Sequence, residues 1–323
     1  MMKKFSIKIA ILSLFASLLI NVACSNKTDK EMVWLSTGFH EPAIDGLRYI
    51  YSADGLHWDT IGGVWLTPSW LTDKKVGEQP VMRDPSIIRS KDGKYHLVWT
   101  CAWRGLSGFG FSSSTNLYEW DAPQFVPAME YDSTTVNVWA PEFFYDPDQD
   151  LTYVIWASCI PGAYPDYLED HLNNHRLYCT TTRDFKEFTP TKLFYEPGFS
   201  VIDATLVYRG PQDYVMVLKD NTRPCRNLRI AFAPSAEGPW TEPSAPFTEG
   251  MCEGPTVIAP EVLNGDYLIY YDAYSHACFG AMRTSDFINF TDYTDSISVP
   301  EGHKHGTMIR VPMSDVQYLL DKQ

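Results

Sequence analysis

The sequence predicts an all-β protein. After residue 31 the chain alternates short apolar runs with turn residues, the pattern of β-strands joined by tight turns. Only the acidic stretch 165–174 has some helical character in this part of the sequence. The 323 residues, 45% of them apolar, are sufficient for one substantial core or two small ones.

One unit recurs four times at intervals of roughly 50 residues, which is typical of the blades of a β-propeller. Each unit has an apolar opening strand, a turn with Asp, Gly or Asn, a Tyr-rich strand, a small-residue strand and an aromatic closing segment. The four opening strands begin DPSIIRS, APEFFYD, DATLVYR and GPTVIAP, at residues 84, 140, 203 and 254. Each unit predicts a four-stranded antiparallel meander.

A fifth blade is predicted to be divided between the two ends of the chain. Residues 32–39, 47–55 and 56–61 match the outer part of the other units but lack an opening strand. The segment HKHGTMIRV at 303–311 supplies one, so pairing of the N- and C-terminal strands would close a five-bladed ring without free sheet edges. Residues 62–80 are left as a long loop of the kind that is usually functional or mobile.

The N-terminus has the features of a secretory signal. Three lysines within the first eight residues precede an apolar run at 9–20, which is too short to span a bilayer comfortably. Small residues then lead to Cys24, which resembles the lipidated first residue of a bacterial lipoprotein; simple secretion is the alternative. Ser25 rather than Asp in the next position favours the outer membrane if the host is Gram-negative.

The chain is therefore expected to divide into a signal peptide (1–23), a lipidated polar tether (24–31) and a propeller catalytic domain (32–323). The mature protein would be a monomer anchored in the cell envelope, facing the periplasm or the surface, with the lipid as its only membrane contact. A net charge of −14 argues against a nucleic-acid partner, because phosphate binding needs clustered Lys and Arg.

Six cysteines follow Cys24: Cys101, Cys159, Cys179, Cys225, Cys252 and Cys278. None of them forms a C-x-x-C pair, which argues against a zinc site. In a chain of this size they are more often buried small hydrophobic residues than a disulfide framework.

Three carboxylates stand at the heads of apolar, β-branched runs in separate units: Asp84 in MRDPSII, Asp203 in VIDATLV and Glu253 in CEGPTVI. Opening strands on successive blades would aim these acids at one central point, as a sugar-cleaving site requires. Asp84 and Asp203 have a structural alternative as turn residues. Glu253 is harder to explain structurally, because a charge at the start of a buried strand is costly without a role or a partner.

Five motifs in order, spanning nearly the whole mature chain, resemble those of glycoside hydrolase family 43. They are RDPSII, WAPEFFYDP, VIDATLV, CEGPTVI and GHKHGT. The resemblance implies a five-bladed propeller that hydrolyses arabinofuranosides, xylosides or galactans with inversion. It also implies that Asp84 is the general base, that Glu253 is the general acid and that Asp203 orients the acid and tunes its pKa.

His305 of GHKHGT resembles the family's central histidine, which often lies beside a bound metal ion or water. The resemblance thus implies a structural calcium ion near the propeller centre with His305 at its side, although no cofactor is required. His303 is two residues away and could face the same side of a strand. The motifs depart from the family at Glu142, where Asp is frequent, and at Ala204, where Pro is common.

Four more residues near the motifs are candidates for sugar binding. Trp103 and Trp139 could form the walls of a pocket or pack between blades. Arg83, beside the predicted base, and Lys219 could contact sugar hydroxyls or the acids, or be ordinary surface residues.

Inversion needs one protonated and one ionised carboxyl group, about 6.5–9.5 Å apart. Asp203 is expected to keep Glu253 protonated, because a neighbouring negative charge raises the pKa of an acid. The leading substrate is a terminal α-L-arabinofuranosyl unit of a plant-type polysaccharide, followed by β-xylosyl and β-galactosyl units. A retaining β-fructosidase and a non-catalytic carbohydrate-binding propeller on a lipid anchor are the alternatives.

Overall fold

The computed structural model describes residues 31–164, 169–170 and 173–322. The expected signal peptide, Cys24 and all but the last residue of the expected tether lie outside these ranges, as does most of the acidic stretch 165–174. Within the described ranges, no helix is both long and apolar enough to cross a membrane.

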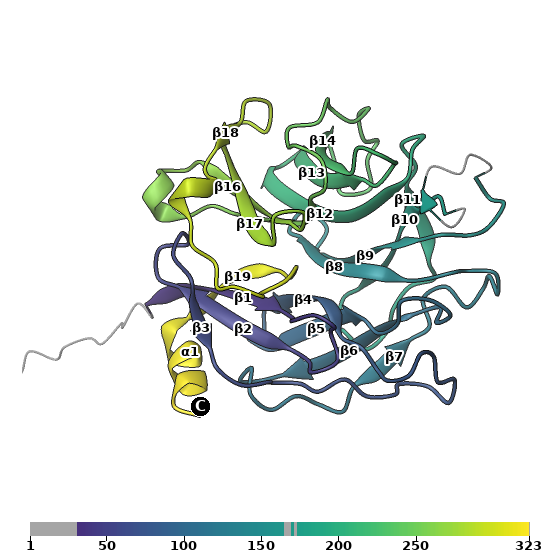
Figure 1. Ribbon diagram of the computed structural model, residues 1–323, viewed down its shortest axis with the longest axis horizontal. Helices are drawn as coiled ribbons and strands as arrows, with labels where there is room; N and C mark the ends of the chain where they lie inside the picture. The colour runs from purple at the N-terminus through teal and green to yellow at the C-terminus, as the bar shows by residue number, and fades with distance from the viewer. Residues whose placement is uncertain (1–30, 165–168, 171–172, 323) are drawn as a thin grey trace, which may run out of the picture.

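Five antiparallel sheets surround a common centre, which confirms the predicted five-bladed β-propeller (Figure 1). The blade made from both ends of the chain contains β19 (Met308–Pro312), β1 (Met32–Gly38), β2 (Arg48–Ser52) and β3 (Asp59–Ile61). The next blade contains β4 (Arg83–Arg89), β5 (Tyr95–Thr100), β6 (Phe109–Ser114) and β7 (Gln124–Val126).

The remaining three blades follow in chain order. The first contains β8 (Trp139–Asp146), β9 (Leu151–Ser158), β10 (Arg176–Thr182) and β11 (Lys192–Tyr195). The second contains β12 (Val201–Gly210), β13 (Asp213–Asp220) and β14 (Asn227–Ala233). The third contains β15 (Glu253–Ile258), β16 (Tyr267–Ala273), β17 (Cys278–Thr284) and β18 (Thr291–Asp292).

The ring closes as predicted, by pairing of the two chain ends. β19 and β1 are antiparallel, with Met32 opposite Pro312 and Ser36 opposite Met308. Figure 1 shows yellow β19 beside purple β1. Each strand thereby gains backbone partners that it would lack if the ring were open.

The blade that begins with β12 has three strands rather than the predicted four. The segment after it still hydrogen-bonds to β14, through the backbone N–H groups of Thr241, Ser244 and Phe247. Pro243 and Pro246 lie between these donors. Because proline has no N–H to donate, the segment does not form a regular ladder.

A short C-terminal helix was not predicted. α1 (Met313–Leu320) follows β19 directly and buries Val316 and Leu319 in the same apolar cluster as residues of β1 and β5. Eight residues are too few for a clear helical period in the sequence. Two 3₁₀ turns, η2 (Glu261–Leu263) and η3 (Thr294–Ser296), lie after β15 and β18.

The long loop 62–80 has no strand or helix, but it is anchored to the first blade. Trp65 and Leu66 exchange backbone hydrogen bonds with Leu47, and Trp65 packs against the apolar cluster of that blade. All six cysteines after Cys24 are unpaired. Four of them are buried, as expected of small hydrophobic residues, and Cys225 and Cys278 are exposed.

Candidate active site

The same β-bulge interrupts four of the five opening strands, close to the propeller centre. Its residue with positive φ is Asp84 in β4, Ala140 in β8, Asp203 in β12 and Gly254 in β15, with φ between 48° and 56°. A bulge redirects the side chains around it. The repeat seen in the sequence therefore places an acid or an aromatic residue at the same central point from each of these blades.

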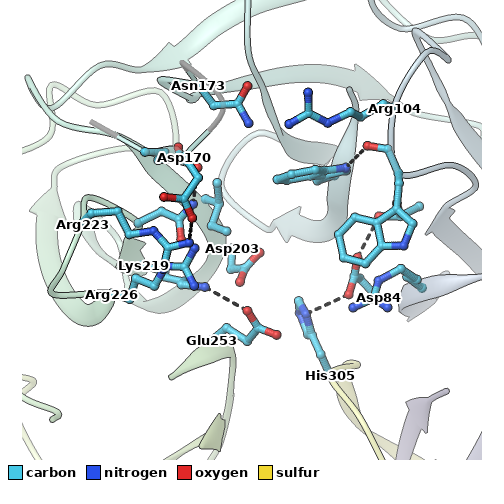
Figure 2. Close-up of a pocket in the computed structure, with 17 residues that line it drawn as sticks. Asp84, Arg104, Asp170, Asn173, Asp203, Lys219, Arg223, Arg226, Glu253 and His305 are labelled. Atoms are coloured by element: carbon cyan, nitrogen blue, oxygen red, sulfur yellow. Dashed lines mark hydrogen bonds and ion pairs between the residues drawn. The ribbon is translucent and has the colours of Figure 1, made fainter. Parts of the chain in front are cut away.

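These side chains meet in one pocket of about 310 Å³ (Figure 2). All eight residues predicted for catalysis or sugar binding line it: Arg83, Asp84, Trp103, Trp139, Asp203, Lys219, Glu253 and His305. They come from distant parts of the sequence, so the propeller fold is what brings them together. Their individual roles stay predictions.

Asp84 is held by hydrogen bonds on both carboxylate oxygens. Its Oδ2 accepts a hydrogen bond of 2.8 Å from Thr100 Oγ1, and its Oδ1 lies 3.2 Å from His305 Nδ1. Burial acts to raise the pKa of Asp84, but the hydrogen bond and charge of His305, helped by Arg83, outweigh it and lower that pKa. Asp84 is therefore ionised, as a general base must be.

Glu253 forms an ion pair with Lys219, one of the contacts considered for that lysine in the sequence. Its Oε2 lies 2.9 Å from the Nζ atom of Lys219, which is almost completely buried. Burial acts to raise the pKa of Glu253, but the positive charge of Lys219 and its hydrogen bond prevail and lower it. Lys219 thus contacts an acid of the site, and it acts on the pKa of Glu253 in the direction opposite to that expected from Asp203.

Asp203 has a raised pKa, whereas that of Glu253 is lowered. It is buried, and its Oδ2 accepts a hydrogen bond of 3.2 Å from the backbone N–H of Gly254. Burial raises the pKa of Asp203, and the charges of Glu253 and Asp84 act in the same direction against those of His305 and Lys219. Because the charges of Asp203 and Glu253 each affect the pKa of the other, the two acids are expected to titrate as a unit.

His305 lies between the acids as a cation. Burial acts to lower its pKa, but the hydrogen bond and charge of Asp84, together with Asp203 and Glu253, raise that pKa to about 9. A Cβ atom at Gly254 would lie 2.4 Å from His305 Cγ, so the glycine of CEGPTVI leaves room for this ring. His303, by contrast, is buried outside the pocket and contacts Ser36 and the Thr37 carbonyl.

A metal ion beside His305 has little support from the donors present. Among the described residues, no three His, Cys, Asp or Glu side chains form a group that could hold a metal ion. The calcium ion stays a prediction, and no step proposed below depends on it.

Two tryptophans form an aromatic wall. Trp103 is 52% exposed and packs edge-to-face on Trp139, with ring centroids 5.7 Å apart, and Arg83 lies over its ring at 4.1 Å. Trp139 donates a hydrogen bond of 2.7 Å to the carbonyl of Trp103 and stacks on buried His175. Arg83 also donates to Glu41, so its guanidinium is a support for this wall.

Glu142, which the sequence marked only as a departure from the family, lies outside the pocket lining and contacts Thr205 and Thr307. Its Oε2 accepts a hydrogen bond of 2.8 Å from Thr307, and its Oε1 lies 3.5 Å from the hydroxyl of Thr205. Burial raises the pKa of Glu142 to about 7, against hydrogen bonds from Ser86 and Thr307. A signal was available, because the aligned repeats have Ser86, Thr205 and Thr256 at this position and only Glu142 is acidic.

Further pocket residues come from loops and could not be found from the repeats. They are Arg104, Glu169, Asp170, Asn173, Asn221, Arg223 and Arg226. Glu169 is tied to His175 Nδ1 at 2.6 Å and to Asn221 Nδ2 at 2.6 Å, so it fixes the ring on which Trp139 stacks.

The chain matches a family model described as a probable glycosyl hydrolase domain, related to glycoside hydrolase family 43, over residues 37–317. No curated protein sequence matches it. A structure described as a "putative exo-beta-1,3-galactanase" from Bifidobacterium bifidum s17 has a TM-score of 0.57 at 13% identity, covering 85% of this chain and 91% of that one. A thermostable family-43 glycoside hydrolase has a TM-score of 0.52 at 17% identity, covering 72% and 80%.

At these identities the structural matches establish a common fold. The family model covers most of the sequence, including every motif with a predicted catalytic acid. The chain therefore belongs to the glycosyl hydrolases related to glycoside hydrolase family 43, and it is an O-glycosyl hydrolase.

Proposed function

We propose that this glycosidase inverts configuration and removes single terminal sugars from plant-type polysaccharides or oligosaccharides. The observation that carries the proposal is the meeting of Asp84, Asp203 and Glu253, from three blades, in one pocket beside two tryptophans. Its volume of about 310 Å³ is at the lower end of ligand pockets, which suits a terminal sugar better than a continuous chain. The leading substrate is an α-L-arabinofuranosyl unit, followed by β-xylosyl and β-galactosyl units.

Asp84 is the proposed base that activates water. Its lowered pKa keeps it ionised, and Thr100 and His305 fix both of its oxygens. A base held in this way can accept a proton from a water molecule that attacks the anomeric carbon.

Glu253 is the proposed acid, and Asp203 supplies its proton. Lys219 lowers the pKa of Glu253 and so favours its ionised form. Burial raises the pKa of Asp203 and so favours the protonated form of Asp203 itself. We infer that the proton passes to Glu253 when a sugar displaces water, and that Glu253 then donates it to the leaving oxygen. The negative charge left on Asp203 would help to retain the proton on Glu253 until transfer.

The experiment is a panel of aryl glycosides with the configuration of the released sugar followed by NMR. Inverted product from one of the three named sugars is expected. Product of retained configuration would contradict the assigned mechanism and favour the β-fructosidase alternative. Sugar binding without hydrolysis of any panel member would favour the non-catalytic alternative.

We also propose that the protein is a monomer held at the cell envelope, in the outer membrane of a Gram-negative host, by a lipid on Cys24. The support is the sequence alone, an apolar run that ends in small residues before this cysteine. A polar tether as far as residue 31 would separate the propeller from the membrane and leave its pocket open to polysaccharides.

A further inference from the structure

The pocket has more positive groups than its own acids neutralise. Six cationic side chains line it, including His305, which is protonated. Four of these form ion pairs: Arg83 with Glu41, Lys219 with Glu253, Arg223 with Asp170, and His305 with Asp84. Arg104 and Arg226 have no carboxylate partner among the residues that the structure describes.

The remaining acids of the pocket are already occupied. Asp203 accepts a hydrogen bond from the Gly254 N–H and favours its protonated form. Glu169 is bound by His175 and Asn221. Neither acid forms an ion pair with Arg104 or Arg226 in the part of the chain that the structure describes.

Arg226 has a well-anchored backbone, but its side chain has N–H groups that lack hydrogen-bond partners. It precedes β14 with φ of 48°, a conformation that few residues other than glycine adopt. Its backbone N–H donates to the Thr222 carbonyl, and its own carbonyl accepts from Cys252. The Nε atom is buried without a hydrogen-bond partner, and one terminal nitrogen contacts only the Tyr274 hydroxyl, at 3.5 Å. A buried donor left unsatisfied is costly, which suggests that a ligand satisfies it.

Arg104 lies across the pocket from Arg226. In Figure 2, Arg226 is beside Lys219 and Arg223 on one wall, and Arg104 is on the other side, near Asn173. Arg104 belongs to the loop between β5 and β6 and is exposed. Both arginines line the pocket that a bound sugar would enter.

This positive pocket belongs to a chain with a net charge of −14. General attraction of polyanions is therefore not expected, and any recognition of negative charge must be local. A neutral sugar would leave both guanidinium groups opposite hydroxyls. A carboxylate or sulfate matches the planar fork of an arginine with two parallel hydrogen bonds.

We propose that the substrate carries an anionic group, a carboxylate or a sulfate ester, on the terminal sugar or its neighbour, and that Arg226 and Arg104 bind this group. The inference rests on the proposed glycosidase function and deepens it, because it adds an acidic glycan as the substrate class.

The test compares matched acidic and neutral oligosaccharides whose terminal sugar is the one cleaved fastest in the aryl-glycoside panel. In the first pair, the unit next to the terminal sugar is glucuronosyl in the acidic member. In the neutral member it is glucosyl, the carboxyl-reduced form. A second pair carries a sulfated galactosyl unit or its desulfated form. The first pair tests the carboxylate source of charge and the second tests the sulfate.

Values of kcat/KM are measured for wild type, Arg226→Gln, Arg226→Lys, Arg104→Gln and the control Arg89→Gln. Arg89 is exposed and lines a different cavity, at the far end of β4. Wild type is expected to prefer the acidic member of one pair by roughly tenfold to a hundredfold, the range for hydrogen bonds between charged groups. Both Gln variants should lose most of this preference, and Arg226→Lys part of it. The two Gln variants should lose more of their kcat/KM on the acidic member than on the neutral member of the pair, and all activities of Arg89→Gln should change little.

Equal kcat/KM for acidic and neutral members of both pairs in wild type would overturn the inference while leaving the glycosidase proposal intact. A preference that both Gln variants retain would also overturn it. If no substrate of the panel is cleaved, the proposed function fails. In that case, calorimetry measures the affinity of the same proteins for both pairs. Tighter binding of an acidic member that is lost in the Gln variants would support the inference, and equal affinity for acidic and neutral members would overturn it. Thermal unfolding of each variant checks that it is folded.

Discussion

At the residue scale, the position of one proton decides how the site works. Lys219 lowers the pKa of Glu253, whereas burial raises that of Asp203, which we propose supplies the proton to Glu253. The two neighbours therefore act on Glu253 in opposite directions, because one is a cation and the other becomes an anion when it releases its proton.

This opposition predicts two shifts of the pH profile with opposite sign. In Lys219→Met, loss of the cation raises the pKa of Glu253, so the basic limb of kcat/KM should move to higher pH by about one unit. In Asp203→Asn, loss of the negative charge lowers the pKa of Glu253, so the same limb should move to lower pH. Activity is measured against pH for both variants and wild type. Shifts in the same direction would rule out Glu253 as the acid.

A series of leaving groups separates the acid from the base. Glu253→Gln should lose most activity on substrates with poor leaving groups but retain more on activated aryl glycosides, because a good leaving group needs little proton donation. Asp84→Asn should fail on both, since water must be activated in either case. The measurement is kcat/KM across aryl glycosides of graded leaving-group pKa. Equal losses for the two variants on every substrate would contradict the roles assigned to them.

Glu142 predicts a pH-dependent cost to stability. Its pKa is about 7 in the folded protein against an ordinary value of 4.5. The protonated form is therefore favoured by folding, and its stabilisation is complete below pH 4.5 and lost as the pH rises through 7. Glu142 retains some solvent exposure, which weakens the effect of burial. We therefore expect the free energy of unfolding to fall by about 2 kcal/mol, less than the full pKa shift would give.

Urea unfolding of wild type and Glu142→Gln at pH 5 and pH 8 measures this difference. From pH 5 to pH 8, the free energy of unfolding of the Gln variant should rise by about 2 kcal/mol relative to that of wild type. A difference between the two proteins that does not change with pH would show that Glu142 is not buried as a neutral acid.

At the scale of elements, local patterns predicted the strands but not all of their partners. Turn residues such as Asp54, Asn116, Asp184 and Asp286 accept backbone N–H groups two and three residues ahead. Because this chemistry is local, the repeat was visible in the sequence. The bulge shared by the opening strands was not predicted, since it appears only when each strand is paired with its neighbour.

The C-terminal elements predict a graded response to truncation. Deleting residues 303–323 removes β19, the partner of β1, and should prevent folding of the whole domain. Deleting 313–323 removes α1 with the buried side chains of Val316 and Leu319, and should cost about 3–6 kcal/mol. Deleting only 321–323 is the control and should leave stability nearly unchanged. Thermal and urea unfolding of the three proteins give the comparison, and native stability after the first deletion would disprove closure by β19.

At the scale of the whole molecule, lipidation of Cys24 predicts where the propeller is found. Wild type expressed in a Gram-negative host should incorporate labelled fatty acid and fractionate with the outer membrane. Cys24→Ala should lose the label and remain uncleaved or become soluble, and Ser25→Ala is a matched control that keeps the lipidated residue. A wild-type protein that is fully soluble and carries no label would disprove the anchor.

The sequence by itself determined the fold class, the ring closure and the identity of eight pocket residues. Strand alternation and turn chemistry are local, and the repeat of about 50 residues requires no knowledge of the third dimension. Asp84, Asp203 and Glu253 could be selected because each opens an equivalent strand, and equivalent strands of a propeller reach the same centre.

Only the tertiary structure decided how these residues act on one another. The pKa values of Glu253 and Asp203 depend on Lys219 and on burial, and both are consequences of distances between blades. The lack of a carboxylate partner for Arg104 and Arg226 among the described residues is likewise visible only in the folded structure. Electrostatic interactions depend on distance and surroundings in space, so the order of residues along the chain does not contain them directly.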